Sequence, residues 1–133
     1  MKGVSSPQKR WSVPVSARSR WVRTGVVMQA GALYSLTAAG CWCDAGNRCG
    51  PGGYDSTKIL RLFEWTRRVR HAKWFALIGA LDSARDDRFV IGQEHSYQPT
   101  RSGELLCFAN DAWIAYFNNH GTVTLTIEVT PAR

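Results

Sequence analysis

Residues 122–129 read TVTLTIEV, and this stretch decides the class of fold. Four branched apolar residues alternate here with three threonines and Glu128. Because successive side chains of a strand point to opposite faces, the period of two predicts a strand with one face on a core and one face in solvent. A strand of this kind is typical of an antiparallel sheet.

Short β-forming stretches separated by turn residues recur along the rest of the chain. We predict further strands within residues 21–27, 33–42, 74–81, 89–91 and 104–108. The stretch 74–81, WFALIGAL, is apolar throughout, as a strand buried on both faces should be. The chain therefore predicts an all-β fold, a jelly-roll-like antiparallel β-sandwich of about seven to eight strands.

Two segments interrupt this pattern of strands. Residues 44–54, DAGNRCGPGGY, hold four glycines and a proline, which predicts a loop. Residues 56–68 place apolar side chains at helical spacing behind Ser56 and Thr57, either of which can cap a helix. We expect one short helix or an irregular Arg-rich insertion here, continuing into the basic stretch 67–73.

Length and charge limit the organisation of the chain. Its 133 residues fit one domain, and 44% hydrophobic residues are enough for a core. The net charge of +7 is concentrated in the first 73 residues, which hold 13 Lys and Arg against three Asp and Glu. We expect residues 1–19 to be a basic, flexible lead-in with one edge strand, and residues 20–133 to form the domain. Such basicity also raises contact with nucleic acid or another polyanion as a minor hypothesis.

Targeting and membrane signals are weak in this sequence. No apolar run approaches the ~20 residues that a membrane-spanning helix needs. Pro7, Lys9 and Arg10 interrupt the apolar region that a secretory signal would require after the basic N-terminus. We expect no membrane span and a cytoplasmic protein, unless export uses a non-classical route.

The four cysteines leave three readings open. Cys41, Cys43 and Cys49 are close in sequence, and Cys107 is distant. They could be inert thiols in a reducing compartment, a Cys43–Cys49 bridge, or zinc ligands, although no histidine lies near them.

The connection between the last two predicted strands is unusually polar. Within residues 110–121 it holds Asn110, Asp111, Asn118 and Asn119. Carboxylate and amide oxygens, with backbone carbonyls, are the ligands that Ca²⁺ takes. The same residue types also suit tight turns, so composition alone leaves both interpretations open.

The order and spacing of several motifs resemble the calcium-dependent galactophilic lectins of the PA-I type. The likeness covers about residues 20–129, including WVRTGVVMQAGALYSLTAAGCW with GPGG at 50–53, and SGELLCFANDAWIAYFNNHGTVTLTIEV. The resemblance implies a jelly-roll-like sandwich that assembles into homo-oligomers. It also implies a Ca²⁺ ion at one end of the sandwich, bridging the protein to two neighbouring sugar hydroxyls.

The resemblance also assigns residues to that site. Asp111 matches the calcium carboxylate, Asn118 and Asn119 the paired asparagine ligands, and Ala115 a residue that contributes its backbone carbonyl. The remaining ligand is a carbonyl in the Gly-rich loop, from Asp44 or Ala45. Asp111 and Asn118 would also hydrogen-bond the sugar.

Other positions bear on the identity of the sugar. Trp113 or Trp42 could cover the apolar face of a sugar ring. The histidine and glutamine that contact galactose in these lectins fall on Thr57 and Leu60, so the hydrogen bonds that select galactose are missing.

We therefore predict a calcium-dependent carbohydrate-binding module, with a carbohydrate or other vicinal diol as its partner. The alternative is a lectin-fold module for protein association without sugar binding, its basic arm contacting a polyanion. We expect no catalysis, because His71, His95 and His120 are scattered and no GxSxG, HExxH or phosphate-loop motif is present.

Overall fold

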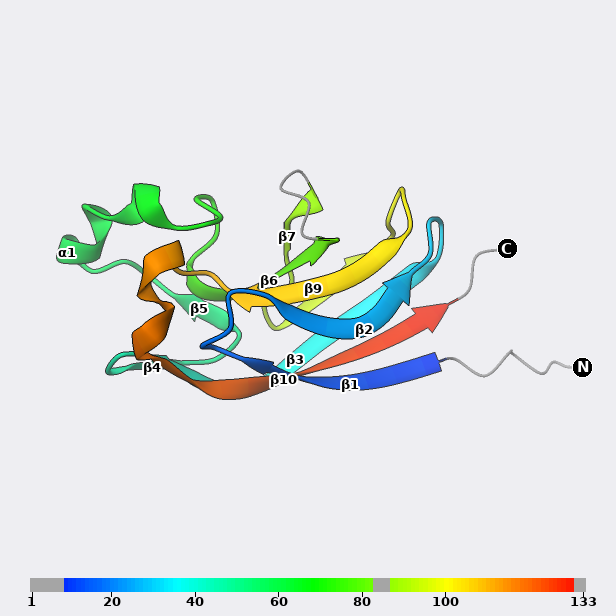
Figure 1. The fold of residues 1–133 in the computed structure, drawn as a ribbon, viewed down its shortest axis with the longest axis horizontal. Coiled ribbons are helices and arrows are strands. Elements are labelled where there is room, and N and C mark those ends of the chain that lie inside the picture. Colours follow the sequence, from blue (N-terminus) through cyan, green and yellow to red (C-terminus); the bar gives the residue numbers. More distant parts are fainter. Residues whose placement is uncertain (1–8, 83–86, 131–133) are drawn as a thin grey trace, which may run out of the picture.

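The computed structural model describes residues 9–82 and 87–130, which fold into two antiparallel sheets stacked face to face (Figure 1). The first sheet has the order β1 (Lys9–Ser16), β10 (Asn119–Thr130), β3 (Leu33–Asp44) and β4 (Asn47–Cys49), and β8 (Glu94–Tyr97) also pairs with β3. The second has the order β2 (Val22–Met28), β9 (Gly103–Ala109), β6 (Trp74–Leu81) and β5 (Gly52–Tyr54), and β7 (Phe89–Val90) also pairs with β6. The predicted all-β sandwich is confirmed, with more and shorter strands than expected.

Strand β10 has the amphipathic character that residues 122–129 predicted. Val123, Leu125 and Ile127 are fully buried between the sheets, whereas Thr122 and Thr124 are exposed. β1 pairs along one side of β10 and β3 along the other, so β10 is the central strand of its sheet.

The expected boundary between a lead-in and the domain at residue 20 is wrong. Residues 9–16 form β1, an edge strand in continuous antiparallel register with β10. Val15 is fully buried opposite Val123, so this strand contributes to the core and belongs to the domain. Residues 1–8 of the expected lead-in lie outside the described residues.

Two hydrophobic clusters explain why WFALIGAL is apolar throughout. Alternate residues of β6, such as Phe75 and Leu77, face the core between the sheets. Ala76 and Ile78 face the opposite side, where Phe108 and Val69 complete a second cluster. Residues 67–73, the Arg-rich segment that follows η1 (Glu64–Thr66), cover this outer face. Every residue of β6 is therefore buried.

The segments expected to be loop and helix are more finely divided than predicted. Strands β4 and β5 lie within residues 44–54, which the glycines alone assigned to a loop. The helix is a single turn, α1 (Lys58–Arg61), followed by η1. The hydroxyl of Thr57 accepts a hydrogen bond from the backbone N–H of Leu60, as a helix cap does.

The strand register decides between the three readings of the cysteines. Cys49 pairs with Trp42, whereas Cys43 pairs with Arg48, so the side chains of Cys43 and Cys49 point to opposite faces of the sheet. Cys107 is buried in the other sheet, where burial raises the pKa of its thiol. All four cysteines are free thiols, and the described part of the chain holds no group of three or more His, Cys, Asp or Glu residues that could bind a metal.

Candidate cation site

The polar residues singled out in the sequence converge at the end of the sandwich where α1, β4 and the 3₁₀ segment η3 (Trp113–Asn118) lie (Figure 1). Asp44, the last residue of β3, is paired with Asn119, the first residue of β10. The backbone N–H of Ala45 donates to the carbonyl of Asn118 at 3.2 Å. The β3–β4 turn and the end of η3 are therefore held together.

Asp111 and Asn119 form the buried centre of this cluster. Their exposed fractions are 2% and 1%. Asn119 Nδ2 donates to Asp111 Oδ2 at 3.0 Å and also to the carbonyl of Ala17 at 3.0 Å. Asp111 Oδ1 accepts from the backbone N–H of Ala112 at 2.7 Å. The Asp111 carboxylate is thus fixed in orientation from both sides.

Two oxygen atoms of the cluster have no hydrogen-bond partner. The side-chain Oδ1 atoms of Asn118 and Asn119 are both buried and unpaired. Buried polar atoms in folded proteins are nearly always paired with a donor, water or an ion. Two unpaired amide oxygens from neighbouring residues, one of which is bonded to a buried carboxylate, are oxygen donors of the kind that a hard cation such as Ca²⁺ takes.

The charges of the cluster also favour a cation. Burial raises the pKa of Asp111 to about 6, and the negative charge of Asp44 adds to the effect. The hydroxyl of Tyr54 donates to Asp44 Oδ2 at 2.5 Å. The pKa of Tyr54 is raised, mainly because the hydroxyl is buried and also because of this hydrogen bond. Two carboxylates close together without a basic partner repel each other, and a divalent cation between them would remove that repulsion.

The other residues assigned to the site have different surroundings. Ala115 lies within η3, and its N–H donates to the carbonyl of Ala112 at 3.0 Å. Trp113, in the same segment, is 49% exposed at the surface. Trp42 is completely buried, packs edge-on against Phe75 and donates through Nε1 to the carbonyl of Gly50. Trp42 is a core residue, so its assignment as a sugar-contacting residue is wrong.

Sequence reasoning missed two features of this end of the molecule. Tyr54, which donates to Asp44, follows the Gly-Pro-Gly-Gly turn without any motif of its own. Asn110, which begins the polar connection, has a role that the sequence does not indicate, because its amide holds residues 69–73 in place. Asn110 Oδ1 accepts from the N–H of Val69, and Nδ2 donates to three carbonyls, of Val69, Ala72 and Lys73.

The surface around the site carries many exposed apolar side chains. They come from α1, η1, η3 and the residues beside them, namely Ile59, Leu62, Phe63, Trp65, Trp113, Ile114 and Phe117.

No helix among the described residues is long and apolar enough to span a membrane.

Comparison with known proteins finds a similar fold in one lectin domain. No protein-family model matches the chain, and no curated protein matches it. Among solved structures, the N-terminal domain of EclA, described as a PllA-like lectin, is similar with a TM-score of 0.68 and 19% sequence identity. The similarity covers 90% of this chain and 96% of that domain. The chain therefore shares the β-sandwich fold of that lectin domain. Assembly into homo-oligomers stays a prediction.

Proposed function

We propose that this domain is a non-catalytic, calcium-dependent carbohydrate-binding module. The observation that carries the proposal is the pair of buried, unpartnered amide oxygens of Asn118 and Asn119, of which Asn119 is hydrogen-bonded to Asp111. These residues would hold Ca²⁺ together with Asp44 and the carbonyl of Ala115. The lectin-type fold of the similar EclA domain supports the same function.

Some residues of the site would bind the cation and others would contact the sugar. Bound Ca²⁺ would supply a positive charge that attracts two adjacent sugar hydroxyls. Asp111 balances that charge, and Asn119, tied to Ala17, keeps the Asp111 carboxylate in place. Asn118 is only half-buried, so we assign it the additional hydrogen bond to a sugar hydroxyl. Trp113 offers an exposed ring for the apolar face of the sugar.

Two measurements test this proposal. Calorimetric titration with Ca²⁺ should release or absorb heat with a stoichiometry of about one ion per chain. A glycan array probed with and without EGTA should then show signals that EGTA removes. If neither calcium binding nor an EGTA-sensitive glycan signal is observed, the proposal is wrong, and the alternative of a lectin-fold protein-association module takes its place.

We predict that calcium affinity depends on pH through Asp111. Its pKa of about 6 lies above the value of ~3.9 in an unfolded chain. Protonation of Asp111 therefore stabilises the metal-free fold at low pH, and this contribution is lost as the pH rises through 6. Because a proton and a cation compete for the same carboxylate, calcium affinity should be about 10-fold lower at pH 5 than at pH 7.

Calorimetry at pH 5, 6 and 7 measures this dependence directly. Repeating the titration at pH 6 in buffers of different ionisation enthalpy should reveal proton release on calcium binding. Thermal unfolding provides a second reading, since Ca²⁺ should raise the Tm more at pH 7 than at pH 5. A calcium affinity that is constant across this range would contradict the role given to Asp111.

We also predict that Trp113 contributes to sugar binding but not to calcium binding. Trp113→Ala should weaken the affinity for an array-identified glycan by about 10-fold, because an aromatic–sugar contact is lost. Calcium affinity measured by calorimetry should be unchanged. Ile114→Ala is a matched control, because Ile114 is 80% exposed in the same 3₁₀ segment. Equal losses of glycan affinity in both variants would argue against a specific contact of Trp113.

A further inference from the structure

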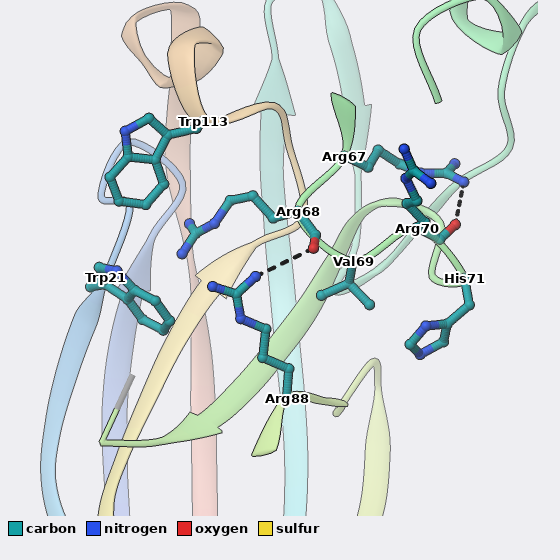
Figure 2. Close-up of a pocket in the computed structure, with 8 residues that line it drawn as sticks. All are labelled: Trp21, Arg67, Arg68, Val69, Arg70, His71, Arg88 and Trp113. Atoms are coloured by element: carbon teal, nitrogen blue, oxygen red, sulfur yellow. Dashed lines mark hydrogen bonds between the residues drawn. The ribbon is translucent and has the colours of Figure 1, made fainter. Parts of the chain in front are cut away.

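Beside the candidate cation site lies a second, basic pocket of about 940 Å³. It is lined by Trp21, Arg67, Arg68, Val69, Arg70, His71, Arg88 and Trp113 (Figure 2). Figure 2 shows the guanidinium of Arg68 between the indole rings of Trp113 and Trp21, with Arg88 reaching toward it from below.

Arg68 is held in this position by bonds from one edge of its guanidinium. Its Nη1 donates to the carbonyl of Arg20 at 2.6 Å and to the hydroxyl of Tyr116 at 2.9 Å. Its Cζ lies 3.5 Å from the ring centre of Phe108, 4.6 Å from Trp21 and 4.7 Å from Trp113. These contacts fix the plane and direction of the group, which is the pre-organisation that an anion-binding arginine needs.

The opposite edge of the same guanidinium is unpaired. Nε and Nη2 of Arg68 are buried and have no hydrogen-bond partner. These two nitrogens form the fork that binds a carboxylate or a sulfate with two parallel hydrogen bonds. Because both atoms are buried, a ligand would reach them only if a neighbouring side chain moved, and we assign this movement to Trp113, whose half-exposed ring is centred 4.7 Å from the Cζ of Arg68.

Arg68 has no carboxylate partner within the part of the chain that the structure describes, and neither has Arg20. Burial lowers the pKa of Arg68, the contact with Tyr116 opposes this shift, and the positive charges of Arg88 and Arg20 add to it. A guanidinium with an unpaired fork and no carboxylate partner is complementary to a small anionic group.

The backbone segments that carry the pocket and the candidate cation site are joined by hydrogen bonds. The N–H of Arg68 donates to the carbonyl of Asp111 at 3.2 Å, and Arg67 forms an isolated β-bridge with Ala112. Arg20 Nε donates to the carbonyl of Trp113 at 2.6 Å. The backbone of the pocket is therefore in direct contact with the backbone of the candidate cation site.

We propose that the ligand is an acidic saccharide, with its ring hydroxyls at the cation site and its carboxylate or sulfate ester on the free edge of Arg68. This inference rests on the proposed function. We favour a saccharide over a nucleic acid, because the basic pocket adjoins a candidate cation site that would bind neighbouring hydroxyls. Lys9 and Arg10, by contrast, belong to β1, which begins at the end of the sandwich opposite α1 (Figure 1).

The test compares each uronic acid with its neutral parent sugar. Galactose, glucose and mannose are titrated against galacturonate, glucuronate and mannuronate by calorimetry, with Ca²⁺ or with EGTA. Galactose 6-sulfate and free sodium sulfate distinguish a carboxylate, a sulfate ester and an anion without a sugar. At least one acidic sugar should bind about 10-fold more tightly than its neutral parent, since the charged fork adds hydrogen bonds.

Variants at Arg68 connect this preference to the pocket. Arg68→Lys keeps a positive charge among the rings but removes the fork, so it should abolish the preference for acidic sugars. Its unchanged calcium affinity would show that the fold is intact. Arg10→Met is the control, because Arg10 is an exposed basic residue of β1, outside the pocket.

The outcomes separate this proposal from the proposed function. Calcium-dependent binding with no preference for acidic sugars, or a preference that Arg68→Lys leaves intact, would overturn the role of the pocket and leave the lectin function standing. Uronate binding that needs Arg68 but persists in EGTA would support the pocket and overturn the calcium function. Sodium sulfate or a labelled oligonucleotide binding as tightly as any acidic sugar would overturn the assignment of a saccharide.

Discussion

Asp111→Asn should lower the calcium affinity of this domain by about 100-fold or more while leaving the fold intact. The substitution removes the buried carboxylate at the centre of the candidate site and keeps its size. The new side chain keeps one carbonyl oxygen, which can still accept a single hydrogen bond, either from the N–H of Ala112 or from Nδ2 of Asn119. Calorimetric titration with Ca²⁺ measures the loss of affinity.

The same substitution should not lower the stability of the metal-free protein. Asp111 is buried beside Asp44, and its raised pKa shows that its charge opposes folding at neutral pH. Asp111→Asn should therefore leave the Tm of the metal-free protein at pH 7 unchanged or raise it, while the increase in Tm on adding Ca²⁺ disappears. Asp55→Asn is the control, because the side chain of Asp55 is 85% exposed and pairs with Lys73 at the surface. Calcium binding retained by Asp111→Asn would place the cation elsewhere.

The largest expected loss of stability comes from Gly53→Ala, by about 3 kcal/mol or more. Gly53, in β5, has a φ of +81°, which side-chain-bearing residues rarely adopt. A Cβ atom there would lie 2.4 Å from the carbonyl oxygen of Trp74 and 2.6 Å from the nitrogen of Ala76. Both are backbone atoms of the buried strand β6, so they cannot move aside without breaking its pairing.

Substitutions at two further glycines distinguish the effect of the positive φ from the effect of the close approach to β6. Gly25 also has a positive φ, of +76°, but no atom lies within 4 Å of its missing Cβ, so Gly25→Ala should cost only about 1 kcal/mol of backbone strain. Gly46 has neither constraint, and Gly46→Ala should change stability by less than ~0.5 kcal/mol. Urea unfolding of the three variants tests this order. A loss for Gly53→Ala no larger than that for Gly25→Ala would show that the close approach to β6 is not real.

The sequence predicted the parts of this fold that depend on local patterns. The unbroken apolar run 74–81 has the same bounds as β6, and the alternating stretch 122–129 lies within β10, which begins three residues earlier and ends one residue later. The short strands β4 and β5 were missed, because their glycines resemble a loop until the pairing with β3 and β6 is known. The inclusion of β1 in the domain was missed for a related reason. Its basic residues suggested a solvated arm, and only its register with β10 shows that Val15 is in the core.

The candidate site shows the same division between local and long-range information. The sequence grouped Asp111, Asn118 and Asn119, and the fold joins Asp111 to Asn119 by a hydrogen bond. The carboxylate of Asp44 and its bond to Tyr54 depend on the β3–β4 turn, which no local pattern specifies. Trp42 could not be placed by composition, because a tryptophan suits both a core and a sugar-binding surface.

The hydrogen bond between Asn119 and the carbonyl of Ala17 has a consequence for folding. It joins residues 102 positions apart, and the pairing of Asp44 with the same Asn119 brings a third distant segment to the cluster. Pairings of such long sequence separation raise the contact order, and two-state proteins of higher contact order fold more slowly. The cluster around Asp111 is assembled from three separate segments, so a ligand that needs all of them binds the native state alone. Such a ligand stabilises the native state by an amount that grows with the ratio of its free concentration to its Kd.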